Sequence, residues 1–202
     1  MAARRYRVML NPSCQYGNRI LGPEGQQWYN EGINMYRQAM ALRHHLQKYE
    51  DIEVLVTRDG EDAPSKLADE MAMTAEMGCD LMLAIHSNAP GPQHQLAGGQ
   101  ATFFRDGDAQ SHALGTLVHE RLLAATREVY PTLQDRGVMT HWKRLAALWS
   151  PGCTSALVEI MFHTNPLERP LLLDPSFQYR AGRAMAEALR AYIDQVLVAK
   201  EV

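Results

Sequence analysis

The chain has 202 residues, of which 46% are hydrophobic and 21% are charged, and its formal net charge is −3. This length and composition are typical of a single soluble globular domain with an ample core. The slightly acidic balance argues against nucleic acid as the main partner, because phosphate binding leaves a basic footprint. Three cysteines without a Cys-x-x-Cys pair argue against a disulfide framework and against a thiolate zinc knuckle.

Short apolar and β-branched runs alternate with segments of helical periodicity along the chain. The runs predict strands at residues 6–10, 52–57, 80–86, 100–105, 145–149 and 156–160. The helical patterns cover residues 31–47, 109–129 and 177–196, with a weaker one at 64–76. Strands that alternate with helices imply an α/β fold. We expect one domain, residues 1–202, with a mostly parallel, twisted sheet of about six strands covered by helices on both faces.

Polar side chains follow three of the predicted strands. They are Cys14 and Gln15 after the first strand, His86 and Asn88 at the end of the third, and Glu159 and His163 in and after the last. In open parallel sheets, ligands bind outside the carboxyl ends of the strands. If these strands are parallel, the six side chains meet on one rim of the sheet.

Glu31 is expected at the same rim by a helical argument. It shares the apolar face of its helix with Met35, Ala39, Leu42 and Leu46, so its carboxylate should point inward. A buried carboxylate is costly unless it is paired or bound to a metal, although a helix N-terminus offsets part of that cost. Two carboxylates and two histidines on one rim match the inventory of a catalytic zinc site. Each alone also fits a simpler role: a loop hydrogen bond, a helix cap or a salt bridge.

Five segments, in the same order as in a known family, support this interpretation. Residues 8–15 correspond to the family's first-strand motif, and residues 54–59 correspond to its second strand, which ends in Thr-Arg. Residues 80–88 correspond to the family segment that ends in Ser-Ile-His-Ala-Asn. Residues 136–137 match an Arg-Gly pair ahead of the fifth strand, and residues 157–166 match a Leu-Val-Glu segment that ends in Asn-Pro. Together they resemble the zinc-dependent N-acetylmuramoyl-L-alanine amidases of the amidase 3 type, which cleave peptidoglycan. The resemblance covers nearly the whole chain.

The resemblance implies an enzyme that hydrolyses the amide bond between N-acetylmuramic acid and L-alanine, in peptidoglycan or in muropeptides. It also implies Zn²⁺ as the cofactor. Glu31 and His86 stand at the family's metal-binding positions, and Glu159 stands at the position of its catalytic glutamate. In this interpretation Glu159 takes a proton from the attacking water and passes it to the leaving nitrogen.

The chain departs from the family at the first zinc ligand. Where the family has Gly-His-Gly, residues 13–15 read Ser-Cys-Gln, so the first histidine is missing. His163 stands where the family usually has an apolar residue, and we expect it to be the relocated third zinc ligand. A Cys14 thiolate is the alternative ligand, and a metal-poor site is the third possibility.

Substrate contacts are expected from side chains beside this site. Gln15 and Asn88 carry amide groups that could orient the substrate or steady the oxyanion. His141 and Trp142 follow the Arg-Gly pair. We interpret them as exposed loop residues, with substrate contact as the alternative.

Two other functions stay open at this stage. The chain could be a catalytically inactive amidase fold that binds peptidoglycan, or a zinc amidohydrolase that acts on a peptide or amide from outside the wall. We expect no separate wall-binding domain and a monomer. No secretory signal and no apolar run near the ~20 residues of a membrane helix are visible. These absences predict a protein that is cytoplasmic as synthesised, with no membrane partner, and that reaches the wall by phage-type release or by export.

Overall fold

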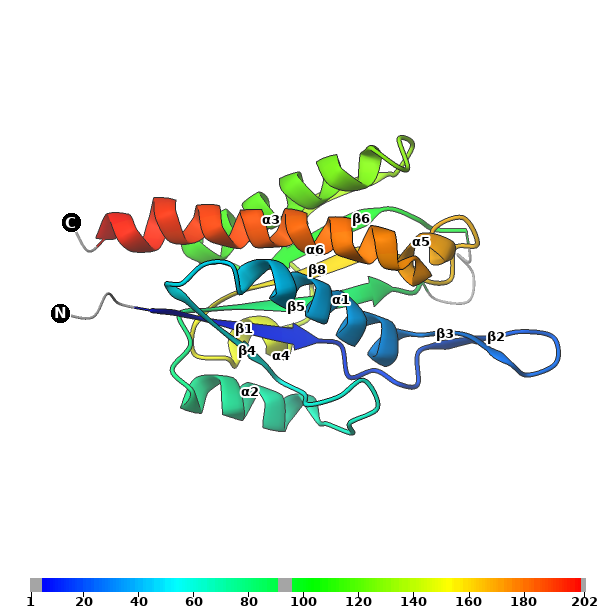
Figure 1. The fold of residues 1–202 in the computed structure, drawn as a ribbon, viewed down its shortest axis with the longest axis horizontal. Helices are drawn as coiled ribbons and strands as arrows, with labels where there is room; N and C mark the ends of the chain where they lie inside the picture. The colour runs from blue at the N-terminus through cyan, green and yellow to red at the C-terminus, as the bar shows by residue number, and fades with distance from the viewer. Residues whose placement is uncertain (1–4, 91–95, 201–202) are drawn as a thin grey trace.

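The main sheet has six strands in the order β4-β1-β5-β8-β6-β7 (Figure 1). The computed structural model describes residues 5–90 and 96–200. All neighbouring strands are parallel except β6 and β8, which run antiparallel. The α/β prediction with a mostly parallel sheet is therefore confirmed, with one reversed pair. The strands are β1 (Tyr6–Pro12), β4 (Ile52–Val56), β5 (Leu81–Asn88), β6 (Gln100–Phe104), β7 (Asp135–Met139) and β8 (Thr154–Phe162).

Helices cover both faces of this sheet (Figure 1). One face packs against α1 (Glu31–Leu46), α3 (Ala109–Arg127) and α6 (Pro175–Tyr192), which continues into η1 (Ile193–Leu197) and η2 (Val198–Lys200). The other face packs against α2 (Leu67–Glu76) and α4 (Ala146–Trp149). A hairpin of β2 (Arg19–Leu21) and β3 (Gln27–Asn30) precedes α1, and α5 (Arg169–Leu173) follows β8. In the described part of the chain, no helix is both long and apolar enough to span a membrane.

The fifth predicted strand was wrong. Residues 145–149 contain helix α4, and the strand is instead β7, which contains Arg136 and Gly137. An apolar run of four or five residues is compatible with either a strand or a buried helical turn. Here Ala147 and Leu148 are both buried in the core between the sheet and α2, which a helical turn allows. The β7 segment lacks alternating apolar residues because it is an edge strand, so its sequence carries little strand signal.

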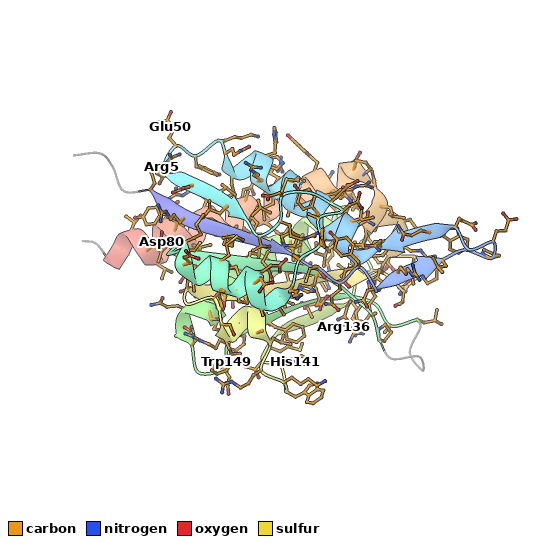
Figure 2. The ribbon with its side chains drawn as sticks, turned by 90° about the horizontal axis from the view of Figure 1, so that it is seen from below. Arg5, Glu50, Asp80, Arg136, His141 and Trp149 are labelled. Carbon is orange, nitrogen blue, oxygen red and sulfur yellow. The ribbon has the colours of Figure 1, made fainter. Side chains whose placement is uncertain are left out.

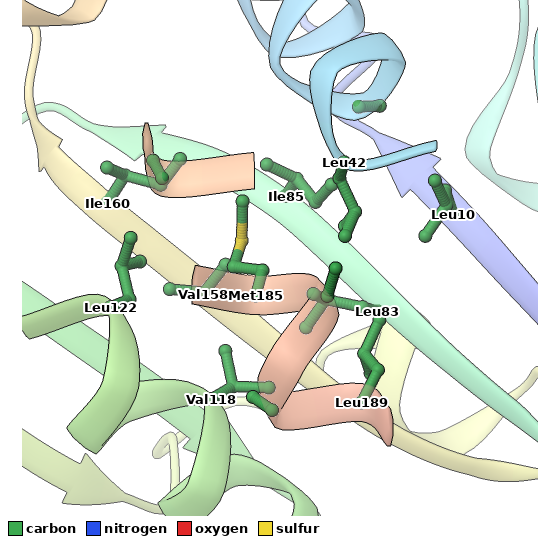
Figure 3. Close-up of a cluster of buried hydrophobic side chains, with 14 of the residues drawn as sticks. Leu10, Leu42, Leu83, Ile85, Val118, Leu122, Val158, Ile160, Met185 and Leu189 are labelled. Carbon is green, nitrogen blue, oxygen red and sulfur yellow. The ribbon is translucent and has the colours of Figure 1, made fainter. Parts of the chain in front are cut away.

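Alternate residues of the central strands pack on opposite faces of the sheet. Leu10, Leu83 and Val158 lie in the core beneath α1, α3 and α6 (Figure 3). Met9 and Met82, each one residue away from a member of that core, lie in the smaller core beneath α2 and α4. The same alternation decides which site residues can share a face.

The contact between α1 and α6 is close enough to depend on a glycine. A Cβ atom at Gly182 would lie 2.8 Å from backbone atoms of Ala41 and Leu42. We therefore expect Gly182→Ala to lower the free energy of unfolding by about 1–3 kcal/mol. In the matched control Gly115→Ala, on α3, the new Cβ would meet Thr102 at an ordinary 3.5 Å, and helix propensity should add roughly 0.5–1 kcal/mol. Urea unfolding of the two variants tests this, and equal effects would contradict the packing argument.

Candidate active site

The carboxyl ends of β1, β5 and β8 lie next to one another at one rim of the sheet. His86 and Glu159 are direct partners in the β5–β8 register, so their side chains project from the same face. That face carries α2 and α4, and there the two residues line a pocket of about 220 Å³. The pocket is lined by Gln15, Leu67, His86, Asn88, Phe103, His141, Leu145, Ala146, Ala147, Leu157 and Glu159.

Glu31 reaches His86 from the start of α1. The Asn30 side chain caps the helix by accepting a hydrogen bond from Ile33 N at 3.2 Å, which makes Glu31 the first helical residue. The Glu31 side chain is only 1% exposed, and its Oε1 lies 3.1 Å from His86 Nδ1. Asn18 Nδ2 donates to the other carboxylate oxygen at 2.7 Å. The buried carboxylate thus has partners for both oxygens.

Gln15 completes this polar group. Its Nε2 lies 3.3 Å from His86 Nδ1, and its Oε1 accepts a hydrogen bond from Asn18 Nδ2 at 3.0 Å. Asn18 therefore bridges Gln15 and Glu31. The sequence offered no signal for Asn18, because it lies in the loop before the β2–β3 hairpin, and only the fold brings it to Glu31.

The Glu31–His86 pair shifts the pKa of both groups. Burial raises the pKa of Glu31, but hydrogen bonds from His86 and Asn18 and the His86 charge outweigh it, so the net shift is downward. Burial lowers the pKa of His86, but the hydrogen bond and charge of Glu31 and the charge of Glu159 outweigh it, so the net shift is upward. These opposite shifts favour an ionised Glu31 beside a protonated His86.

Glu159 has a different environment. Burial raises its pKa to about 8, with a further upward contribution from the Glu31 charge and an opposing one from His86. Its Oε2 is buried and has no hydrogen-bond partner among the described residues. A carboxyl group in a pocket, with one buried oxygen free of hydrogen bonds and a pKa near the working pH, is suited to accept and donate protons.

His163 lies on the opposite side of β5 from His86. Its Nδ1 is 3.0 Å from Ser87 Oγ and 3.1 Å from the Ser87 carbonyl oxygen. Its ring stacks on Tyr29, whose hydroxyl is 2.7 Å from the same Ser87 Oγ. Burial lowers the pKa of His163, so the ring is neutral near pH 7. The Glu31 charge opposes this downward shift of the His163 pKa. No sequence pattern indicates the roles of Tyr29 and Ser87, because they depend on this tertiary contact.

Cys14 is half-buried in the loop that follows β1. Its thiol hydrogen-bonds with Ser65 and lies near Glu70, on the α2 side of the site. Burial and the Glu70 charge raise the pKa of Cys14, which keeps the sulfur protonated near pH 7. A protonated thiol is a poor zinc ligand, because zinc binds the thiolate.

The Glu31–His86 pair offers donor atoms of the types that zinc binds, but two side chains are fewer than the three protein ligands of a catalytic zinc site. Glu31 and His86 supply an oxygen and a nitrogen 3.1 Å apart, and these are ligand types that zinc takes. No group of three His, Cys, Asp or Glu side chains that could hold a metal is found among residues 5–90 and 96–200. A third protein ligand would have to join the Glu31–His86 pair.

Residues 13–191 match the family model described as N-acetylmuramoyl-L-alanine amidase, Amidase_3. The chain belongs to this amidase family. The match spans every predicted site residue, from Cys14 to His163. No curated protein sequence matches the chain significantly.

Solved amidase structures share the fold of this amidase. An N-acetylmuramoyl-L-alanine amidase from Clostridium difficile 630 is 21% identical, with a TM-score of 0.83 over 96% of this chain and 100% of that one. The catalytic domain of CwlV from Bacillus (Paenibacillus) polymyxa var. colistinus is 20% identical, with a TM-score of 0.78 over 94% and 98%. Ami1 from Mycobacterium smegmatis is 15% identical, with a TM-score of 0.74 over 95% and 98%. At these identities, the likeness establishes the fold.

Proposed function

We propose that this amidase hydrolyses the amide bond between N-acetylmuramic acid and L-alanine in peptidoglycan or muropeptides, with Zn²⁺ as its cofactor. The main support is the Glu159 carboxyl group in the pocket beside His86. Its Oε2 is buried with no hydrogen-bond partner among residues 5–90 and 96–200, and its pKa is raised to about 8 by burial. Strongly shifted pKa values cluster at catalytic sites, because general acids and bases work best with a pKa near the working pH. This observation favours catalysis over an inactive, peptidoglycan-binding role.

The chain's own residues supply the proton transfers. Glu159 accepts a proton from the attacking water and returns it to the alanine nitrogen as the amide bond breaks. A pKa near the working pH makes both transfers feasible. Gln15 and Asn88 line the same pocket and are proposed to orient the substrate through their amide groups.

Glu31 and His86 are the residues that would hold the zinc ion, and His163 is the proposed third ligand. When bound, zinc polarises the scissile carbonyl and lowers the pKa of a water molecule. His163 lies across β5 from His86, so this role requires its ring to turn toward the Glu31–His86 pair. Ser87 contacts Nδ1 and leaves Nε2 as the donor atom. Metal-binding histidines are commonly oriented by a hydrogen bond at the ring nitrogen that does not bind the metal. Coordination also requires a neutral ring, which burial favours for His163.

The direct test is a cleavage assay on purified muropeptides, combined with zinc quantification of the purified protein. We expect bound zinc, release of a peptide with a new L-alanine amino terminus, and loss of activity after chelation. Zinc-loaded protein that binds muropeptides without cleaving them would instead indicate a binding module. Cleavage of simple acyl-amino acids but not of muropeptides would indicate a substrate from outside the wall.

The third ligand is tested by three substitutions. We expect His163→Ala to weaken zinc binding by at least about 100-fold, since even the loss of a second-sphere contact costs 10–100-fold. Cys14→Ser should retain zinc, because the thiol faces Ser65 and Glu70. Gln15→Ala should retain zinc but reduce turnover. Metal titration by calorimetry measures all three, and zinc that is retained in His163→Ala but lost in Cys14→Ser would assign the ligand to the thiolate.

A further inference from the structure

A cluster of aromatic and cationic side chains surrounds a second hollow next to the pocket. Trp142 lies between β7 and α4 and is 83% exposed, and Trp149 ends α4. Lys143 Nζ lies 4.4 Å from the Trp142 ring centre, and the Arg144 guanidinium carbon lies 4.0 Å from that of Trp149. These four residues and His141 line a hollow of about 190 Å³. We call it the tryptophan hollow.

The tryptophan hollow adjoins the site of the proposed chemistry. His141 lines both this hollow and the pocket that contains Glu159. His141 and Trp149 lie at the same edge of the molecule (Figure 2). The His141 ring packs edge-on against Phe103, a pocket residue, and stacks against Trp142. A substrate that extends out of the pocket past His141 would therefore enter the hollow.

The charges of the tryptophan hollow favour an anionic ligand. The whole chain carries a net charge of −3, yet Lys143 and Arg144 are adjacent here. Among the described residues, neither one forms an ion pair with a carboxylate, whereas nearby Arg105 is paired with Asp108. Asp106 is the one carboxylate among the residues that line the hollow. A guanidinium stacked on an indole keeps its N–H groups free for a carboxylate.

We propose that the tryptophan hollow binds the carboxylate-bearing end of the peptide that leaves the scissile bond. This inference rests on the proposed function, because it assigns a place to the peptide half of that substrate. The bond to be cleaved joins a sugar acid, as its amide, to the amino end of a peptide. The sugar side is uncharged at that amide, whereas the peptide side presents at least its terminal carboxylate. Two unpaired cations thus select the peptide rather than the sugar.

The test compares two N-acetylmuramoyl tripeptides that differ only at the peptide terminus, one a free acid and one a C-terminal amide. We expect wild-type protein to have a KM about tenfold lower for the acid, in line with one charge-assisted hydrogen bond. Lys143→Gln combined with Arg144→Gln should remove that preference and leave kcat unchanged. The matched control, Arg43→Gln combined with Lys48→Gln, removes two exposed cations from the far end of α1 and should keep the preference.

Calorimetric binding of the two free tripeptides separates this inference from the proposed function. Preferential binding of the acid that disappears in the Lys143/Arg144 variant supports the tryptophan hollow, even if wild-type protein cleaves neither substrate and the proposed function fails. Equal affinity of wild-type protein for acid and amide overturns the inference. A preference that survives in the Lys143/Arg144 variant also overturns it, whatever the cleavage assay shows.

Discussion

Glu159→Gln is expected to reduce kcat for muropeptide hydrolysis by about 100- to 10,000-fold, the usual contribution of a positioned acid–base group. Glutamine keeps the size of the side chain but cannot exchange protons. Because Oε2 of Glu159 has no described partner, the substitution breaks no hydrogen bond found in the structure. Steady-state kinetics with the zinc-loaded protein measures the effect. Glu120→Gln, an exposed change on α3, is the control, and activity within a few-fold of wild type in Glu159→Gln would refute the assigned role.

The same variant has a predicted effect on stability that depends on pH. In the folded protein, burial raises the pKa of Glu159 from an ordinary 4.5 to about 8. The His86 charge opposes this shift, and the Glu31 charge adds to it. The protonated form is therefore stabilised by folding. This contribution is complete below pH 4.5 and is lost as the pH rises through about 8. We expect metal-free Glu159→Gln to match wild type in thermal unfolding at pH 5 and to be more stable at pH 9. Equal stability at both values would contradict the raised pKa.

Removing either member of the Glu31–His86 pair is expected to abolish zinc binding and hydrolysis together. Glu31→Gln retains an acceptor for Asn18 but loses the charge, and His86→Ala loses the nitrogen donor. Both variants should bind zinc only at background level, because a catalytic zinc site needs three protein ligands and each variant removes one of them. Zinc quantification and circular dichroism would be measured alongside activity.

The control for this pair is His44→Ala, which removes an exposed histidine from the same helix as Glu31. It should leave zinc content and turnover unchanged. Normal zinc content in both Glu31→Gln and His86→Ala would contradict the assignment of the metal site. Loss of activity with retained zinc would restrict the pair to an electrostatic role.

The fold could largely be predicted from periodicity. The apolar faces of the segments that became α1, α3 and α6 were visible at helical spacing, and each central strand was a short apolar run. Asp174 caps α6, because its side chain accepts a hydrogen bond from Ser176 N. Strand direction was not visible, because side-chain alternation is the same in either direction. The reversal of β6 relative to β8 therefore required the tertiary structure.

The candidate site could also be predicted only in part from the sequence. Strand-end positions placed His86 and Glu159 together at one rim, since neighbouring parallel strands end at the same edge. Sequence spacing could not show that His163 would lie on the other side of β5, bound to Ser87. Glu159 and His163 are four residues apart, so strict alternation would place them on the same face. The β5–β8 register shifts between His86 and Asn88, where two residues of β5 match three of β8, and His163 follows this irregularity.

The sequence by itself determined the α/β class, the amidase resemblance and the meeting of His86 and Glu159 at one rim, because these depend on local periodicity and on motif order. The tertiary structure decided which atoms are in contact: Glu31 with His86, Cys14 with Ser65, and the ring of His163 with Tyr29. It also placed the hollow at Trp142 beside the pocket. These contacts join segments that are distant along the chain, so they depend on how strands and helices pack rather than on the pattern within any one of them.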